Sequence, residues 1–273
     1  MAKPLAHQAR KRFGQNFLED DQIIQRIVRS ISPKAGEQLL EIGPGRGALT
    51  EPLLAASGGQ LQALELDRDL IPILRTRLFR YPDLVIHEGD ALNFNFTSLV
   101  NAPGKLRVVG NLPYNISTPL IFHLLAQSDI IEDMHFMLQQ EVVDRLAADV
   151  GSKNYGRLGV MVQYRCAVTP LFSVPPSAFQ PQPKVMSAVV RLKPHAKLPV
   201  TANNPKLLER VVKAAFSQRR KTLRNNFKGL IDPGILSDLE IDPNLRAEQL
   251  SLQKFVTISN ALDDSELDNQ FSS

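Results

Sequence analysis

The chain has 273 residues, of which 43% are hydrophobic and 22% are charged, so it can form one large and one small domain with packed cores. Its single cysteine, Cys166, excludes an intrachain disulfide, and no apolar run approaches the roughly 18 residues that span a membrane as a helix. The formal net charge is only +4, so the distribution of the cations is more informative than their number.

The first residues are basic and free of acids, and they lack the apolar core of a secretory signal. An organelle transit peptide has a similar composition, but here the basic run of Arg10, Lys11 and Arg12 continues directly into a longer motif at residues 12–18. With one cysteine and no signal, the composition favours a reduced, cytoplasmic location.

From residue 20 to 140 the sequence alternates between strand-like and helix-like stretches. Short apolar stretches predict strands at residues 38–41, 60–65, 84–87, 107–110 and 134–138. Helical patterns fall at residues 23–30, 48–56, 69–80, 119–126 and 141–148. Strands separated by helices are typical of βαβ units, so we predict an α/β, Rossmann-like parallel sheet with helices on both faces.

The second half of the chain predicts two more strands and then a helical region. Residues 160–168 and 187–192 are rich enough in β-branched residues for strands at one edge of the sheet. Residues 193–204 contain prolines and predict a linker. After it, residues 205–216 have helical spacing. We therefore expect a first domain over residues 1–195 and a small all-α domain over residues 196–273.

A glycine-rich turn, Glu-Ile-Gly-Pro-Gly-Arg-Gly at residues 41–47, follows the first of the strands predicted between residues 20 and 140. Glycines permit a tight turn and let a ligand approach the backbone, and dinucleotide proteins and phosphate binders share this feature. Here Gly43, Gly45 and Gly47 give a G-x-G-x-G spacing, which differs from the dinucleotide motif. The carboxylate of Glu41 suits an amino group or a sulfonium better than a pyrophosphate.

Acidic residues also follow the next two strands. Glu65 ends the second strand, where a carboxylate can accept hydrogen bonds from both ribose hydroxyls of an adenosyl group, and Asp67 is a neighbouring competitor for that role. Asp90, in Gly89-Asp90-Ala91 after the third strand, can accept a hydrogen bond from an adenine amine. Because ligands of open α/β sheets bind at the carboxyl ends of the strands, the three elements predict one cofactor site.

The tetrapeptide Asn111-Leu112-Pro113-Tyr114 follows the fourth strand. An adenine amine is a poor nucleophile, because its lone pair is delocalised into the ring. A site that accepts both N–H groups favours the tetrahedral nitrogen, and Asn111 and a backbone carbonyl near Leu112 can do this while Pro113 fixes the geometry. Tyr114 can stack on a flipped base. The alternative, an ordinary turn with a packed tyrosine, leaves the cofactor elements unexplained.

This tetrapeptide resembles the (Asp/Asn/Ser)-Pro-Pro-(Tyr/Phe) signature of amino methyltransferases. From Lys11 to about Lys228, the chain resembles the bacterial small-subunit (16S) rRNA adenine N6,N6-dimethyltransferase family. The matching segments are residues 12–18, 41–47, 65–67, 89–91, 110–118 and 176–192.

The resemblance implies a class I methyltransferase that uses S-adenosyl-L-methionine. It implies N6,N6-dimethylation of two adjacent adenosines in the 3′-terminal hairpin of 16S rRNA during small-subunit biogenesis. We expect a monomer without membrane contact. The implied cofactor contacts are Asn16, Leu18, Gly43, Glu65, Asp90 and Asn111. The implied catalytic set is Asn111, Leu112, Pro113, Tyr114 and Phe179, with the target adenine held between the rings of Tyr114 and Phe179.

Two regions of the sequence predict contacts with RNA. The basic N-terminal arm contains Phe13 and Phe17, and interleaved cations and aromatic rings suit phosphates and bases. Residues 210–228 contain seven cations and no acid, whereas residues 229–273 contain nine acids and two bases; an ordinary solvated helix face mixes both signs. The residues expected to contact RNA are Arg219, Arg220, Lys221, Arg224 and Lys184, and Arg157 and Arg191 would widen this surface.

Three alternatives stay open from the sequence. A large-subunit rRNA dimethylase of the macrolide-resistance type has the same chemistry, but residues 111–118 and 219–224 favour the small-subunit family. An RNA-binding ribosome-assembly factor would not need a complete cofactor site. A dinucleotide-dependent oxidoreductase would leave residues 111–114 unexplained. The histidines and Cys166 have no ligand-like spacing, so we expect no metal.

Overall fold

The computed structural model describes residues 15–101 and 103–262, which include neither Phe13 nor the basic residues that precede it. Contacts between residues divide the chain into two compact units. Unit 1 comprises Met1–Val143 and Val168–Pro194, and unit 2 comprises Asp144–Ala167 and His195–Ser273. Unit 2 resumes at His195, one residue before the boundary that the sequence predicts, and residues 144–167, which fall within the predicted first domain, belong to unit 2.

The central feature of unit 1 is a mixed sheet of seven strands in the order β4-β3-β2-β5-β6-β9-β7. Strands β2 to β6 pair in parallel, whereas β9 runs antiparallel to β6, so the sheet is not wholly parallel. The strands are β2 (Gln38–Ile42), β3 (Leu61–Glu65), β4 (Leu84–Glu88), β5 (Leu106–Asn111), β6 (Ile131–Gln139), β7 (Cys166–Val174) and β9 (Ser187–Pro194).

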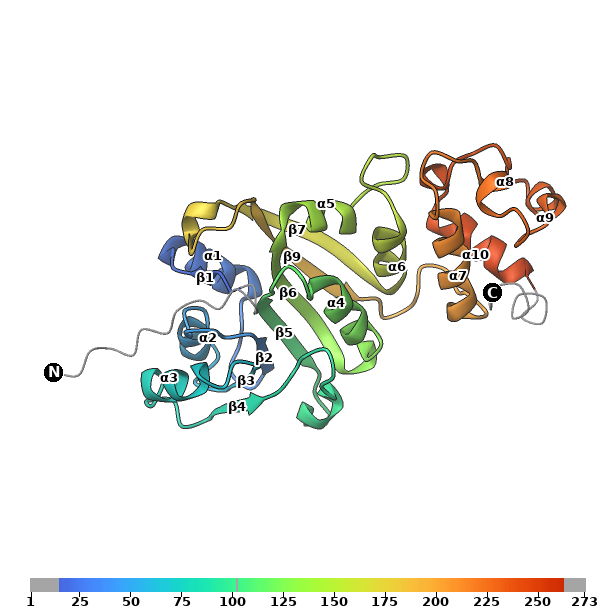
Figure 1. The fold of residues 1–273 in the computed structure, drawn as a ribbon. Helices are drawn as coiled ribbons and strands as arrows, with labels where there is room; N and C mark the ends of the chain where they lie inside the picture. The colour runs from blue at the N-terminus through green and yellow to red at the C-terminus, as the bar shows by residue number, and fades with distance from the viewer. Residues whose placement is uncertain (1–14, 102, 263–273) are drawn as a thin grey trace. The chain divides into compact units, whose positions relative to one another are not determined.

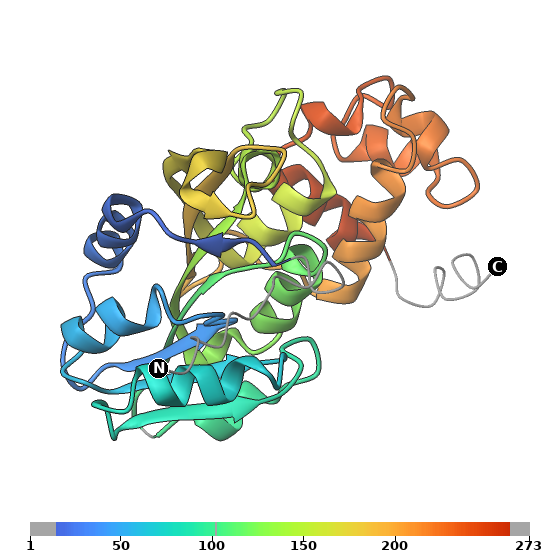
Figure 2. The same ribbon diagram turned by 60° about the vertical axis from the view of Figure 1, so that its left-hand side comes forward.

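Helices cover both faces of this sheet, which confirms the predicted Rossmann-like α/β fold (Figures 1 and 2). The helices are α1 (Asp21–Ile31), α2 (Thr50–Ala56), α3 (Leu70–Arg77), α4 (Ser117–Leu125) and α5 (Gln140–Leu146). Helix α1 begins where the side chain of Asp20 accepts hydrogen bonds from two backbone N–H groups. Its buried face shares one apolar core with residues of α2 and α3. No helix in the described residues is long and apolar enough to cross a membrane.

A short two-stranded sheet brings distant parts of unit 1 together. Strand β1 (Phe17–Leu18) pairs antiparallel with β8 (Phe179–Gln180), with Leu18 opposite Phe179. Both strands are too short to show periodicity in the sequence, and neither was predicted.

Unit 2 is helical, but one of its helices was predicted as a strand. Its helices are α6 (Arg157–Arg165), α7 (Pro205–Ala215), α8 (Leu223–Asn226), α9 (Pro233–Asp238) and α10 (Leu252–Ala261). The strand predicted at residues 160–168 is wrong, because residues 157–165 form α6 and β7 begins only at Cys166. Val160, Met161 and Tyr164 of α6 are buried in one core with α7, and a Cβ on Gly159 would lie 2.5 Å from the carbonyl oxygen of Arg145. Tertiary packing therefore overrides the β propensity of these residues.

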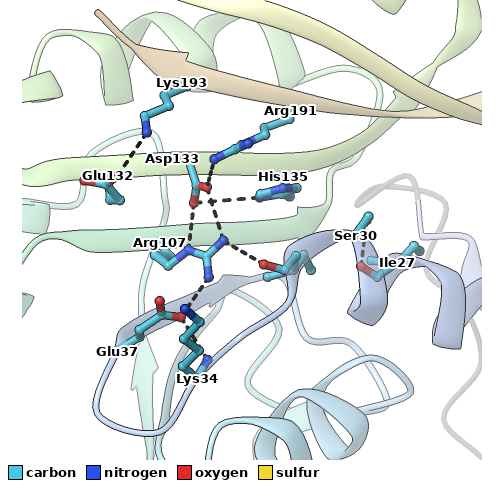
Figure 3. Close-up of polar contacts among 11 residues, drawn as sticks. Ile27, Ser30, Lys34, Glu37, Arg107, Glu132, Asp133, His135, Arg191 and Lys193 are labelled. Carbon is cyan, nitrogen blue, oxygen red and sulfur yellow. Dashed lines mark hydrogen bonds and ion pairs between the residues drawn. The ribbon is translucent and has the colours of Figure 1, made fainter. Parts of the chain in front are cut away.

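A buried ion-pair network ties three strands of the sheet together (Figure 3). Asp133 of β6 is 1% exposed. Its carboxylate accepts hydrogen bonds from Arg107 Nε of β5 at 2.9 Å and from an Arg191 nitrogen of β9 at 2.9 Å. Arg107 also donates to Glu37 and to the carbonyl of Ile31, both at 2.7 Å. Although burial opposes its charge, the hydrogen bonds from Arg107 keep the pKa of Asp133 below its ordinary value.

We predict that Arg107→Ala lowers the free energy of unfolding by about 3–5 kcal/mol, because it removes the main partner of a buried carboxylate. The matched control is Lys193→Ala, which breaks the half-exposed pair of Lys193 with Glu132 and should cost about 0–1 kcal/mol. Urea unfolding of both variants measures the difference. Equal losses in the two variants would contradict the structural role of the network.

Candidate active site

A cavity of about 380 Å³ lies in unit 1 at the carboxyl ends of β2, β3, β4 and β5. Five segments border it: residues 15–18 around β1 and the four segments that end or follow these strands. Parallel pairing brings those strand ends to one edge, as the sequence predicted. The predicted cofactor residues that border the cavity are Asn16, Leu18, Gly43, Glu65, Asp90 and Asn111.

The glycine-rich turn closes one wall of the cavity. Gly43 and Gly45 have φ angles of 69° and 60°, which L side chains rarely adopt. A Cβ on Gly45 would lie 3.2 Å from the ring of Phe17, so β1 packs directly over the turn. The guanidinium carbon of Arg46 lies 4.3 Å from the centroid of the same ring. Phe17 therefore covers the turn, a contact that the sequence did not indicate.

Glu65 is buried, and its carboxylate is held by the backbone. One oxygen accepts from the N–H of Gly45 at 3.1 Å, and the other accepts from the N–H of Asp67 at 2.8 Å. Burial raises the pKa of Glu65, while these hydrogen bonds act in the opposite direction. The carboxylate of Asp67 accepts in turn from the side chain of Gln15 at 3.1 Å. Each acid is thus fixed in place before a ligand binds.

Glu41 is the third buried carboxyl group at the cavity. It is 2% exposed, and its Oε2 atom has no hydrogen-bonding partner among the described residues. Burial raises the pKa of Glu41 from 4.5 to about 7; the side chain of Thr50 acts in the opposite direction, and the nearby charge of Glu65 adds to the rise. Three buried carboxyl groups make this wall suitable for a cation with hydroxyl and amine donors, and unsuitable for a pyrophosphate.

Asp90, after β4, occupies a different environment. It is half-buried, and its two oxygens accept from the N–H of Leu92 at 3.0 Å and from the side chain of Asn93 at 2.9 Å. These contacts orient the carboxylate at the rim of the cavity, where each oxygen retains a lone pair for a ligand amine.

The tetrapeptide at residues 111–114 borders the cavity from the end of β5. The side-chain nitrogen of Asn111 donates to the carbonyl of Asn16 at 3.0 Å, which identifies Oδ1 as the group that can accept from a ligand. The carbonyls of Pro113 and Tyr114 accept from Ile116 and Ser117. The carbonyl of Leu112 receives no hydrogen bond from the described part of the chain, so it is the better second acceptor.

The two aromatic residues expected to hold an adenine lie in different environments. Tyr114 borders the cavity, and its hydroxyl lies 2.9 Å from Oγ of Ser187, which is 1% exposed. Phe179 is 3% exposed and does not border the cavity, although it pairs with Leu18, which does. The sequence pattern did not single out Ser187, whose only signal is its position at the start of β9.

The cations expected to contact RNA are distributed over both units. Arg219, Arg220, Lys221 and Arg224 are exposed in unit 2, and Lys184 is exposed in unit 1. Two cations that we expected to widen this surface pair with acids instead: Arg191 with Asp133, and Arg157 with Glu209 at 2.8 Å. Among the described residues, no group of three or more His, Cys, Asp or Glu side chains is arranged to hold a metal ion.

Comparisons with known proteins match nearly the whole chain. Residues 6–264 match the family model described as ribosomal RNA adenine dimethylase. The chain is 59% identical over 260 residues to ribosomal RNA small subunit methyltransferase A of Marinomonas sp. (strain MWYL1), covering 95% of this chain and 97% of that protein. It is 58% identical over 262 residues to the protein of the same name from Pseudomonas aeruginosa, covering 96% and 97% of the two chains.

Solved structures with similar folds include a dimethyladenosine transferase and an rRNA methyltransferase. A dimethyladenosine transferase from Plasmodium falciparum has a TM-score of 0.76 at 28% identity, with 89% of this chain and 95% of that chain covered. The 23S rRNA methyltransferase ErmE has a TM-score of 0.71 at 24% identity, with 91% and 100% covered, a likeness that shows the fold alone.

The raised pKa of Glu41 predicts a measurable dependence of stability on pH. A carboxyl group whose pKa rises on folding stabilises the folded state while it is protonated, so its contribution is complete below pH 4.5 and is lost as the pH rises through about 7. Glu41→Gln is neutral at every pH. Its free energy of unfolding should therefore increase relative to wild type between pH 4.5 and 8, by on the order of 3 kcal/mol.

Urea unfolding across this pH range measures the difference. Glu132→Gln, at an exposed position, is the matched control and should follow wild type. A constant difference between Glu41→Gln and wild type would show that Glu41 does not titrate in this window.

Proposed function

The chain belongs to the ribosomal RNA adenine dimethylase family, and from this membership we propose that it methylates 16S rRNA. The proposed reaction transfers methyl groups from S-adenosyl-L-methionine to the N6 amines of two adjacent adenosines in the 3′-terminal hairpin. The observation that supports it best is that one cavity is bordered both by three buried carboxyl groups and by the Asn111 side chain. The site for a cationic methyl donor thus lies next to the site for a planar amine.

The residues of the cavity fit S-adenosyl-L-methionine, which when bound supplies a methyl group activated by a sulfonium centre. Glu65 offers both carboxylate oxygens to the ribose hydroxyls, from an orientation fixed by Gly45 and Asp67. Asp90 accepts from the adenine amine of the cofactor. Glu41, whose Oε2 has no partner among the described residues, faces the cationic part of the molecule. Asn16, Leu18 and Gly43 complete the walls.

The target amine is held by the residues at the end of β5. Oδ1 of Asn111 accepts one N–H, and the carbonyl of Leu112 accepts the other. Both contacts would stabilise the tetrahedral nitrogen. As its bond to the methyl carbon forms, the sulfur–methyl bond would break and leave a neutral thioether, and the amine proton would then pass to water. No strong base is required, so the rate enhancement comes from alignment. Pro113 fixes the backbone that presents both acceptors.

Two aromatic rings hold the target base in this proposal. The hydroxyl contact with Ser187 sets the orientation of the Tyr114 ring, which stacks on the flipped adenine. Phe179 of β8, the partner strand of β1, supplies the second ring, which requires that entry of the base uncover this buried side chain. Arg219, Arg220, Lys221, Arg224 and Lys184 contact phosphates of the RNA.

The named relatives favour the small-subunit substrate. Proteins named as small-subunit rRNA methyltransferases are 57–60% identical to this chain, whereas the 23S rRNA methyltransferase ErmE is 24% identical. A cavity bordered by all the predicted cofactor residues and by Tyr114 favours an enzyme over an assembly factor that only binds RNA. The substrate we propose is rRNA in an immature small subunit, encountered in the cytoplasm by a monomeric enzyme during ribosome biogenesis.

The direct test uses labelled cofactor and the two ribosomal subunits from cells that lack this methylation. We expect label in the small subunit only, at two adjacent adenosines near the 3′ end of its rRNA. Mass spectrometry of the digested RNA should identify N6,N6-dimethyladenosine. Label in the large subunit would favour the macrolide-resistance type of substrate, and no label in either would contradict the proposed reaction.

Asn111→Ala should abolish methyl transfer, with a loss of at least about 100-fold in kcat, because the nitrogen loses the acceptor that favours its reactive geometry. The variant should bind rRNA as wild type does, measured by filter binding at one salt concentration. The assay is run at saturating cofactor, since Asn111 also borders the cofactor cavity. Normal turnover would exclude the assigned role.

Glu65→Gln and Asp67→Asn decide which acid contacts the ribose. Glutamine keeps the shape of Glu65 and one of its acceptors but loses the charge, so we expect cofactor affinity to fall by about tenfold or more by calorimetry. Asp67→Asn should have a smaller effect, since the carboxylate of Asp67 binds Gln15. The reverse order would assign the ribose contact to Asp67.

A further inference from the structure

Three segments of unit 2 are joined by hydrogen bonds from two side chains to the backbone. The segments are residues 149–156 (the 149–156 loop), residues 216–222 after α7 (the basic turn), and α8. A guanidinium nitrogen of Arg219 donates to the carbonyl of Lys153 at 2.5 Å, which attaches the basic turn to the loop. The side chain of Asn226, 8% exposed, donates to the carbonyls of Ala215 at 2.6 Å and Gln218 at 3.2 Å, which attaches α8 to the end of α7 and to the basic turn.

The 149–156 loop is itself held in place by the rest of unit 2. The N–H of Gly151 donates to the carbonyl of Glu248 at 2.7 Å. Tyr155 is 2% exposed, and its ring lies edge-on to that of Phe216, with 6.1 Å between centroids. The loop is therefore fixed at both ends and by the Arg219 contact. Lys153 is exposed on it.

The charges on these segments are not balanced by neighbouring acids. Within the described residues, no carboxylate lies within 4.0 Å of the five exposed cations Lys153, Arg219, Arg220, Lys221 and Arg224. Arg157, next to the loop, is paired with Glu209, and Asp149 is the one acid in the loop. Fixing like charges on adjoining segments is unfavourable unless a polyanion binds them.

We infer that the 149–156 loop, the basic turn and α8 form one preorganised RNA-binding surface, in which Lys153 contacts a phosphate and Arg219 positions the loop. The inference rests on the proposed function for its RNA partner. It assigns Arg219 a second role beyond charge, because its contact with the Lys153 carbonyl aligns two cation-bearing segments. Preorganisation lowers the conformational cost of binding, so the surface suits a rigid, structured RNA.

The first test measures the salt dependence of binding to an unmethylated transcript of the 3′ domain of 16S rRNA, between 50 and 200 mM KCl. Lys153→Ala should reduce the slope of log K against log salt by about 0.7–0.9, the value for one lost phosphate contact. The matched control is Lys254→Ala, an exposed lysine of α10 in the same unit, which should leave the slope unchanged. Thermal melting verifies that both variants fold.

The second test separates the charge of Arg219 from its positioning role. Arg219→Gln removes the charge but keeps an N–H donor for the Lys153 carbonyl, whereas Arg219→Ala removes both. We expect Lys153→Ala to weaken binding in the Arg219→Gln background and to have little effect in the Arg219→Ala background. Arg220→Ala, which leaves this contact intact, should combine additively with Lys153→Ala.

The outcomes distinguish this inference from the proposed function. If Lys153→Ala behaves like Lys254→Ala while wild-type protein binds and methylates the RNA, the inference is wrong and the proposed function stands. If Lys153→Ala combines additively with Arg219→Ala, the positioning role of Arg219 is wrong. If the wild-type protein neither binds the transcript nor labels the small subunit, both proposals fail together.

Discussion

The parallel pairing of β2 with β3 and β5 is the constraint on which the site depends. This pairing places Glu41, Glu65 and Asn111, which are far apart in the sequence, at one edge of the sheet. The approach of β5 to β2 is so close that a Cβ on Gly110 would lie 2.7 Å from the carbonyl oxygen of Ile42. Only glycine fits there, so the position of Asn111 follows from backbone packing rather than from a flexible loop.

Around that edge, the acids serve the architecture of the site as well as the proposed ligand. Glu65 holds the glycine-rich turn through the N–H of Gly45 and the start of the next loop through Asp67. The same carboxylate that we assign to the ribose therefore also shapes the cavity. The amino end of β5 is held differently, because Arg107 there belongs to the Asp133 network, while the other end of the same strand presents Asn111 to the cavity.

Periodicity made the first part of the fold predictable. The strands from residue 38 to 139 and the helices between them follow from alternation of apolar stretches, and residues 41, 65, 90 and 111 follow from motifs at strand ends. Helix α6 could not be predicted in this way, because its residues are buried on most sides and a buried helix and a buried strand have the same composition. Three contacts depend on long-range packing and cannot be predicted from a local sequence pattern. They are the packing of Phe17 on the glycine-rich turn, the contact of Ser187 with Tyr114, and the hydrogen bond of Arg219 to the 149–156 loop.

The assignment of residues 144–167 to unit 2 has a consequence for how the chain can be divided. The polypeptide passes between the units at residues 143–144, 167–168 and 194–195, so neither unit is a continuous stretch. A truncation after Pro194 would leave α6 behind without α7, and it would expose Val160, Met161 and Tyr164, which share a core with that helix. During synthesis, unit 1 cannot add β9 to its sheet until α6 has been made. Ending the chain after Pro194 therefore does not isolate unit 1, and an expression of unit 1 alone has to replace residues 144–167 with a short linker.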